Sequence, residues 1–400
     1  MFADRTQWDL TPNRLARRRA QLRRKGVPLL DLTESNPTRC RFDYPADWLA
    51  PLSEASSLAY EPAPLGLPEA RQALSSLYAD AGAWIPPERI GLTASTSEAY
   101  GFLLRLLCNP GDSVLIPQPS YPLFEHLWGL HDVLPRRYAL CYRPGPNGAG
   151  ERWRLDREAL EAAADSRSRA VVLVEPNNPT GSFLDSEEWG WVMDLCRRSR
   201  LALIRDEVFS DYRYAPADPA GSRFRAAPAG LLSFTLGGLS KSLGLPQMKL
   251  GWFAASGPEP LLQEALARLE LIADTALSVN TPVQKALPGW LAQRRAIQSQ
   301  ILGRLLENRR FLQERLQGAP VRLLESDGGW SALLRVPGLV EEEEFLLGLM
   351  ERRHLVAYPG YFFDFEEPGF LVVSLLPPPE RFQEGILRLL EEAARCTISG

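Results

Sequence analysis

The chain has 400 residues, 45% of them hydrophobic, which is enough to form two domains or one large domain with a smaller partner. Its 45 basic and 49 acidic residues give a formal net charge of -4, so no global field favours nucleic acid or an anionic membrane. No apolar run in the sequence reaches the roughly 20 residues that cross a bilayer. The five cysteines are scattered without CxxC spacing, which argues against a disulfide framework or a metal site and favours a cytoplasmic location.

Residues 1–45 are predicted to form an N-terminal arm whose helix packs with the smaller domain. Thr11 and Pro12 are expected to supply an N-cap and a first-turn proline ahead of the arginine-rich stretch 14–24. This pattern favours a solvated helix over a targeting segment or a nucleic-acid-binding arm.

Residues 46–282 are predicted to form a large α/β domain, because short apolar runs alternate with helical patterns from about residue 89. The predicted strands are 89–94, 113–117, 170–176, 201–207 and 231–236, and the predicted helices are 97–107, 122–130, 186–199 and a stretch near Glu158. The Gly- and Pro-rich segment 142–150 indicates a surface loop. Because open α/β sheets bind ligands at the carboxyl ends of their strands, function is expected in the loops there.

After Gly257 the pattern changes to long helices followed by short strands. The predicted helices are 259–277, 283–316, 341–352 and 378–395, and the predicted strands are 321–324, 330–336 and 370–376. Residues 283–400 are therefore expected to form a smaller α+β domain.

Lysine is scarce in this chain. Only Lys25, Lys241, Lys249 and Lys285 occur among the 45 basic residues. A lysine can lose its proton and attack a carbonyl, which an arginine cannot do. Lys241 lies in GGLSKSLGLPQMKLGW, which taken alone is also compatible with a loop lysine before a buried strand.

Four other segments accompany the lysine segment in chain order. They are LAYEPAPLGLPEARQAL from residue 58, LTASTSEAYG from 92, EPNNPTG from 175 and LALIRDEVFSDYRY from 201. Over nearly the whole chain these segments resemble the class I/II aminotransferases of the aspartate aminotransferase superfamily. The resemblance implies the pyridoxal 5'-phosphate (PLP)-dependent transferase fold type I, which has a mostly parallel sheet flanked by helices in the large domain and a smaller α+β domain.

The resemblance also implies PLP as the cofactor and assigns roles to individual residues. Lys241 would hold PLP as a Schiff base and move the Cα proton, while Asp206 would pair with the pyridine nitrogen. Asn178 would bind the ring oxygen and Tyr121 would stack on the ring. The expected phosphate-side residues are Ser95, Thr96, Ser97, Ser240 and Lys249, with Tyr60 supplied by a neighbouring subunit. A homodimer with shared active sites is therefore expected.

Each of these segments also has a structural interpretation when it is considered alone. Asp206 could be a helix cap, residues 95–97 an ordinary helix N-terminus, Tyr121 a core residue and NNPTG any tight turn. Their shared order along the chain favours the cofactor site.

Four positions depart from the family pattern. Lys249 stands where an arginine is usual, Gly238 where a phosphate-binding serine is common, and Phe209 where a tyrosine touches the ring oxygen. Val372 stands where an arginine usually clamps the substrate α-carboxylate.

The segment LTESNPTRCRFDYP is the expected source of a replacement for that arginine. Its Ser35 and Asn36 resemble the family's substrate loop, and we hypothesise that Arg39, or with less support Arg41, binds the carboxylate. The alternative is that both arginines are simply exposed on a loop.

The resemblance implies an aminotransferase that acts on a small-molecule amino donor and a keto acceptor. Because of Val372 and Phe209, a PLP-dependent lyase, decarboxylase or cyclising enzyme is an alternative. A non-catalytic PLP-binding regulator is less favoured, since only about 45 residues precede the large domain and such regulators usually carry a DNA-binding domain there. No metal, nucleic-acid or membrane partner is expected.

Overall fold

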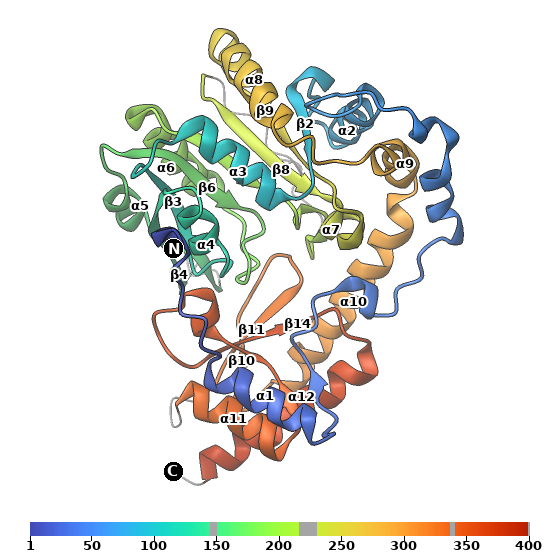
Figure 1. Cartoon of the computed structure of the whole chain (residues 1–400). Helices are drawn as coiled ribbons and strands as arrows, with labels where there is room; N and C mark the ends of the chain where they lie inside the picture. The colour runs from blue at the N-terminus through green and yellow to red at the C-terminus, as the bar shows by residue number, and fades with distance from the viewer. Residues whose placement is uncertain (145–149, 216–229, 337–340, 399–400) are drawn as a thin grey trace.

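A central eight-stranded sheet organises the larger part of the chain (Figure 1). The computed structural model describes residues 1–144, 150–215, 230–336 and 341–398. In spatial order the strands of this sheet are β2 (Ile90–Thr93), β9 (Gly251–Ser256), β8 (Ser233–Gly238), β7 (Ala202–Asp206), β6 (Ser168–Val174), β3 (Ser113–Gln118), β4 (Leu134–Pro144) and β5 (Glu151–Leu155). The strands from β8 to β4 pair in parallel, whereas β2, β9 and β5 pair antiparallel with their neighbours. The predicted mostly parallel sheet is therefore confirmed.

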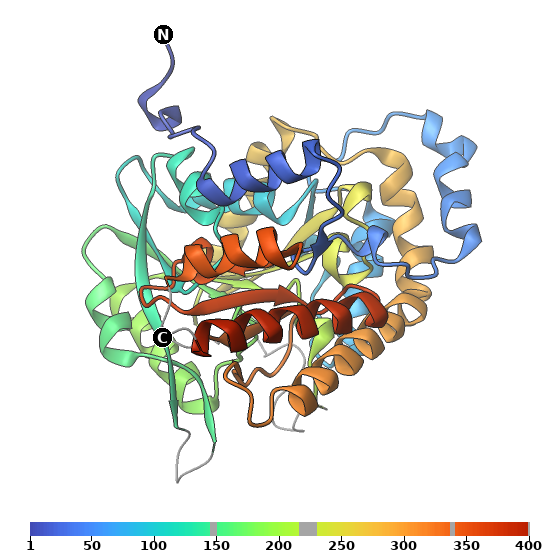
Figure 2. The ribbon, with the colours of Figure 1, turned by 90° about the horizontal axis from the view of Figure 1, so that it is seen from below.

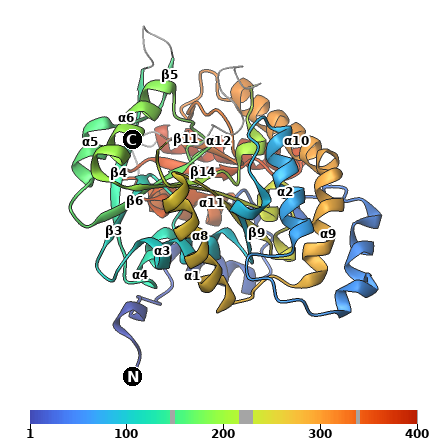
Figure 3. The ribbon, with the colours of Figure 1, turned by 90° about the horizontal axis from the view of Figure 1, so that it is seen from above.

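Side chains of the parallel strands alternate between two cores, because successive residues of a strand point to opposite faces of the sheet. Val114 and Ile116 pack with one set of helices, and Leu115 between them packs with the other set. The first set is α3 (Thr96–Leu107), α4 (Phe124–Gly129) and α8 (Glu259–Asp274), and the second is α5 (Arg157–Ala163) and α6 (Ser186–Ser199). Figure 3 shows the two sets on opposite sides of the sheet.

The edge of the sheet near β2 is covered by two further helices, α2 (Pro68–Asp80) and α9 (Thr281–Ala292), which pack against each other. The short helix α7 (Leu239–Ser242) follows β8 directly, and the long helix α10 (Arg294–Arg315) leads from α9 to the second part of the chain (Figure 1).

The smaller part of the chain combines an antiparallel sheet with helices. The sheet has the order β10 (Arg322–Leu323), β11 (Ser331–Arg335), β14 (Phe370–Ser374) and β13 (Tyr358–Pro359). Helix α11 (Glu342–Arg352) contacts both α1 (Arg14–Arg24) and α12 (Pro379–Ile398), and the three helices lie side by side in Figure 2. The N-terminal strand β1 (Leu30–Asp31) pairs in parallel with β12 (Leu355–Val356), so the N-terminal arm belongs to this smaller unit.

The structure corrects three predictions of local structure. The expected helix 283–316 is two helices, which end and begin around Gln293. The N-cap of α1 is Asn13, whose side chain accepts a hydrogen bond from the Ala16 amide, and not Thr11. In the expected loop 142–150, strand β4 continues to Pro144; residues 145–149 lie outside the described part of the chain.

Strands β4, β5 and β9 were not predicted from the sequence. Strand β4 carries many half-exposed polar side chains, so it lacks a continuous apolar run. Within the described ranges, no helix has both the length and the apolar character that a membrane span requires.

Candidate active site

Asp206 is the last residue of β7, at the carboxyl end of the parallel strands. The alternation of side chains along this strand directs Asp206 toward α3, and directs Arg205 toward α6, where its guanidinium lies 5.5 Å from the centre of the Trp189 ring. Tyr100 of α3 donates a hydrogen bond of 3.0 Å from its Oη to Asp206 Oδ2, and the Val208 amide donates one of 3.2 Å to Oδ1. The carboxylate is therefore buried but bonded at both oxygens.

Lys241 lies close enough to Asp206 for their charges to interact. Burial raises the pKa of Asp206 to about 6, against the opposing effects of the Val208 and Tyr100 hydrogen bonds and of the Lys241 charge. Burial lowers the pKa of Lys241 to about 8, and the charge of Asp206 opposes this shift. A substantial fraction of Lys241 is consequently a neutral amine near pH 8, the form that attacks carbonyl groups.

Aromatic rings from both domains surround the lysine amine. Lys241 Nζ lies 5.3 Å from the centre of the Phe209 ring and 4.9 Å from that of Trp330, which immediately precedes β11 of the smaller domain. Tyr212 Oη donates a hydrogen bond of 2.7 Å to the Lys241 carbonyl. These contacts fix the lysine backbone and place an apolar wall beside its amine.

The N-terminus of α3 forms a candidate phosphate site next to this pair. Ser95 is the N-cap and accepts a hydrogen bond of 3.2 Å from the Glu98 amide, while the other first-turn amides have no acceptor within the helix. Gly251 packs against this turn so closely that a Cβ atom there would come within 2.9 Å of Ser95 C and Thr96 N. At Gly238 a Cβ atom would lie 3.5 Å from Gly251 Cα and 3.6 Å from Thr96 Cγ2, which are ordinary contacts, so there is room for a Cβ atom.

The other predicted phosphate-side residues lie around the same region of the fold. Ser97 is exposed in the first turn of α3, and Ser240 is half-buried in α7 beside Lys241. Lys249 is exposed and has a left-handed backbone with φ of 50°, two residues before Gly251, the first residue of β9.

Asn178 and Tyr121 lie at the carboxyl ends of β6 and β3. Asn178 is half-buried in a turn closed by a 2.7 Å hydrogen bond from the Gly181 amide to the Asn177 carbonyl. Burial and the nearby Asp206 charge raise the pKa of Tyr121, so its hydroxyl lies in the field of the same carboxylate. Tyr121 is therefore positioned near Asp206 and could contact a ring bound there, whereas the contact of Asn178 with such a ring stays a prediction.

Tyr60 is 73% exposed and does not reach the Lys241 region within its own chain. It borders a hollow whose lining includes Ser278, and Ser278 Oγ donates a hydrogen bond of 2.5 Å to Glu98 Oε2 in the first turn of α3. The exposed tyrosine therefore borders a hollow that is connected through Ser278 to the first turn of α3.

The predicted substrate loop packs near the lysine segment through the side chain of Pro37. A Cβ atom at Gly244, three residues after Lys241, would lie 3.3 Å from Pro37 Cβ. Ser35 is exposed, and Asn36 Oδ1 accepts a hydrogen bond of 3.1 Å from the Thr38 amide.

The two arginines of this loop point into solvent. The Arg39 side chain is 73% exposed with Glu34 3.7 Å away, and that of Arg41 is 70% exposed with Glu380 3.1 Å away. The hypothesis that Arg39 binds the substrate carboxylate thus stays a prediction.

Val372 lies inside an apolar cluster that also contains Trp153, Phe363 and Phe370. In the sheet it is paired with Leu333 on one side and with Tyr358 on the other. The position where the family usually carries a guanidinium is thus filled by buried apolar side chains.

Sequence reasoning missed Tyr100, Tyr212 and Trp330. Tyr100 follows Thr96 by four residues on α3, a spacing that places both side chains on one helix face and could have revealed it. Tyr212 and Trp330 are distant from Lys241 in the sequence, and no local signal marks either of them.

The family of the chain follows from comparison with known proteins. A family model described as aminotransferase class I and II matches residues 33–389, so the chain belongs to this family. It is an enzyme that transfers amino groups, and its cofactor is PLP. In the described ranges, no cluster of three or more His, Cys, Asp or Glu residues could hold a metal ion.

Individual relatives extend over most of the chain. Alanine aminotransferase of Mycobacterium tuberculosis is 29% identical over 381 residues, which are 92% of this chain and 86% of that protein. Glutamate-pyruvate aminotransferase AlaA of Escherichia coli is 26% identical over 371 residues, 89% of this chain and 88% of that protein. The structure of alanine aminotransferase from Pyrococcus furiosus superimposes with a TM-score of 0.87 at 22% identity, covering 99% of this chain and all of that one. The expected fold type is thereby confirmed.

Proposed function

We propose that this aminotransferase moves the amino group of an amino acid to a 2-oxo acid, with Lys241 as the residue that holds PLP as a Schiff base. The observation that carries the proposal is the pair formed by the half-buried Lys241 and the buried Asp206, in which loss of hydration lowers the pKa of the lysine amine to about 8. The names of the relatives suggest alanine and glutamate as donors and pyruvate as an acceptor.

The residues around this pair have the chemistry that the cofactor needs. Bound PLP supplies an aldehyde and an electron-withdrawing ring. Asp206, ionised and bonded by Tyr100, would hold a proton on the ring nitrogen, and Asn178 would bind the ring oxygen. Tyr121 would cover one face of the ring. The phosphate would be bound by Ser95, Thr96, Ser97, Ser240 and Lys249, and a partner subunit would add Tyr60.

Lys241 has a second role in this proposal. Its amine, released when the substrate amine takes its place, would remove the proton from the substrate Cα and return a proton during transfer. The aromatic wall of Phe209 and Trp330 next to Nζ limits the hydration of the amine, which favours its neutral, proton-accepting form, while the ring faces attract the charged form.

A homodimer is proposed on the basis of the exposed side chain of Tyr60. Leu58, beside it in the sequence, is 90% exposed, and Leu277 in the lining of the same hollow is 40% exposed. Apolar side chains gathered near a solvent-facing tyrosine are typical of a subunit interface. A cytoplasmic location also stays a prediction, in agreement with five cysteines that are all free thiols.

A single-turnover experiment tests the reaction. Purified holoenzyme mixed with L-alanine or L-glutamate in the absence of acceptor is expected to form one equivalent of pyridoxamine phosphate and of 2-oxo acid per site. The Lys241→Ala variant should lose about 10²- to 10⁴-fold in turnover, whereas Lys25→Ala, on the exposed end of α1, should retain it. Release of carbon dioxide or ammonia without pyridoxamine phosphate would instead indicate one of the other PLP reactions.

The proposed contact of Arg39 with the substrate carboxylate is tested with separate variants. If Arg39 binds the substrate carboxylate, Arg39→Ala raises the KM for the amino donor, while Arg41→Ala, on the same loop, leaves it near the wild-type value. Unchanged KM and kcat in Arg39→Ala would disprove this role without affecting the assignment of Lys241.

A further inference from the structure

A cavity of about 300 Å³ lies between the two domains, separate from the Lys241 region. Its wall from the large domain includes Leu140 and Tyr142 of β4 and Trp153 of β5. Its wall from the smaller domain includes Phe365 and Phe370. Neither Lys241 nor Asp206 lines the cavity, so the reaction proposed above does not account for it.

Aromatic rings from both domains meet in this cavity. The Trp153 ring centre lies 5.4 Å from that of Tyr142, 5.7 Å from that of Phe365 and 6.2 Å from that of Phe370. Phe365 and Phe370 are stacked, with their centres 4.3 Å apart. The faces of such rings attract cations, most strongly when the ring is an indole.

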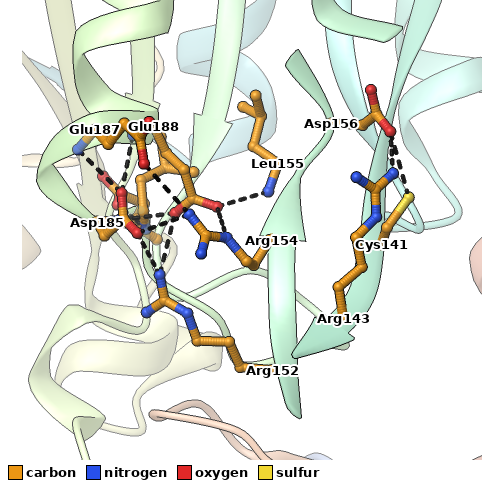
Figure 4. A network of polar contacts seen from close by, with 11 residues as sticks. Cys141, Arg143, Arg152, Arg154, Leu155, Asp156, Asp185, Glu187 and Glu188 are labelled. Atoms are coloured by element: carbon orange, nitrogen blue, oxygen red, sulfur yellow. Dashed lines mark hydrogen bonds and ion pairs between the residues drawn. The ribbon is translucent and has the colours of Figure 1, made fainter. Parts of the chain in front are cut away.

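The charged residues of the lining favour the same kind of ligand. Three carboxylates, Asp364, Glu366 and Glu367, line the cavity against a single guanidinium, that of Arg143. Arg143 is paired with Asp156, outside the lining, as Figure 4 shows. The positive charge of Arg143 is thereby already balanced by a carboxylate outside the lining, so it does not neutralise the carboxylates that line the cavity.

Among these carboxylates Glu366 is the most available. Asp364 is 3.3 Å from a guanidinium nitrogen of Arg137, and Glu367 is 3.3 Å from one of Arg335. Glu366 is exposed and, within the described residues, has no ion pair. A bound cation would find an uncompensated carboxylate at the rim and aromatic rings inside, where two of the rings already attract cations: the Arg335 guanidinium lies 4.2 Å from the centre of Phe370 and that of Arg322 5.5 Å from the centre of Tyr142.

We propose that this cavity binds a small organic ammonium ion with an apolar or aromatic body. The volume of about 300 Å³ is at the lower end of small-molecule sites. The ligand is distinct from the amino donor, because it is held by charge and aromatic faces and not by condensation with the cofactor.

Occupancy of the cavity would stabilise the contact between the domains. Beside the cavity, Gln118 Nε2 donates a hydrogen bond of 2.9 Å to the Asp364 carbonyl, and the Ser120 amide donates one of 2.9 Å to the Phe363 carbonyl. Ser120 immediately precedes Tyr121 of the candidate active site. A ligand that touches both walls favours the arrangement in which these bonds are made, which couples the cavity to the position of Tyr121.

Benzyltrimethylammonium is a suitable probe, because it has no N–H group and cannot condense with PLP. Titration of the holoenzyme by calorimetry is expected to show saturable 1:1 binding that weakens with salt and persists at saturating amino donor. Choline should bind more tightly than its neutral isostere 3,3-dimethylbutan-1-ol. The Glu366→Gln variant should bind the probe about threefold more weakly, whereas Glu307→Gln, an exposed carboxylate on α10, should bind it as the wild type does.

A double variant, Glu366→Gln with Glu367→Gln, extends the test and should weaken binding about tenfold or more. Absence of saturable binding at millimolar probe, equal binding of the neutral isostere, or affinity unchanged in the double variant would each overturn the proposal. Competition between the probe and the amino donor would also overturn it, because it would place the cation in the reaction site. All these results are independent of whether Lys241 transfers amino groups.

Discussion

Tyr100 Oη donates a hydrogen bond of 3.0 Å to Asp206 Oδ2 at the buried end of β7. This bond favours the ionised carboxylate, and it works against burial, which raises the pKa of Asp206 to about 6. The tyrosine is therefore a positioning residue for the acid that faces the cofactor ring.

Removal of this donor should shift the pH dependence of the reaction. Tyr100→Phe leaves burial unchanged and removes a bond to the ionised form, so the pKa of Asp206 should rise and the acidic limb of the kcat/KM profile should move to higher pH. At neutral pH we expect kcat/KM to fall about tenfold. Tyr212→Phe, which removes a bond to the Lys241 carbonyl, should leave the acidic limb where it is.

The ionised carboxylate of Asp206 should lower the stability of the apoprotein at neutral pH. Its pKa in the folded state, about 6, exceeds the usual 3.8, so its contribution to stability is fully present below pH 3.8 and is lost as the pH rises through 6. Asp206→Asn should therefore raise the Tm of the apoprotein by about 2 to 5 °C at pH 8 and by less at pH 5.

Asp112 should have the opposite effect on stability. A hydrogen bond from the Asn109 amide lowers the pKa of Asp112, so Asp112→Asn should lower the Tm at pH 8. Calorimetry of both variants across this pH range checks the assignment. Equal effects of Asp206→Asn at both pH values would contradict it.

The rate at which PLP enters the apoprotein should follow the ionisation of Lys241. Below its pKa of about 8 the neutral fraction of the amine, and with it the rate, should rise about tenfold per pH unit and then level off. The free model amine Nα-acetyl-lysine, with a pKa near 10.4, should keep rising to about pH 10. Stopped-flow absorbance of the lysine-bound cofactor measures both. A plateau only above pH 10 in the protein would refute a shifted pKa.

Two glycines beside the phosphate site should respond differently to serine. At Gly238 the backbone is extended and a Cβ atom meets only ordinary contacts, so Gly238→Ser should add a hydroxyl near Thr96 and tighten PLP binding about 3- to 10-fold. At Gly251 a Cβ atom would come within 2.9 Å of the Ser95 and Thr96 backbone, so Gly251→Ser should weaken cofactor binding and lower the Tm. Equilibrium dialysis of PLP distinguishes the two; similar affinities in both variants would contradict this geometry.

Local signals explain which elements could be predicted from the sequence. Helix α6 was predicted with its observed bounds, because Asp185 and Glu188 form a capping box at its start and its apolar spacing is regular. The break at Gln293 had no such signal, since the nearest proline and glycine, Pro288 and Gly289, lie inside α9, and α10 begins without a side-chain cap. Strand β4 was missed because its side chains are mostly half-exposed and partly charged.

The residues of the candidate site also fall into two groups, those that the sequence indicates and those that only the fold brings together. Lys241, Asp206 and the N-terminus of α3 stand in recognisable motifs, and the structure brings them into one region. Tyr212 and Trp330 reach the lysine only because the chain folds back on itself across a large sequence separation. No periodicity or cap encodes such a contact, so it requires the three-dimensional structure.

The pairing of β1 with β12 has a mechanical consequence for the segment that follows. Leu32 is bonded to the smaller domain through Val356 and Ser374, while Tyr44 Oη donates a hydrogen bond of 2.6 Å to the Gly244 carbonyl near Lys241. Residues 33–43 are thus anchored at one end to each domain. A change in the relative position of the two anchors would be transmitted through this stretch, which carries the predicted substrate residues Ser35, Asn36 and Arg39.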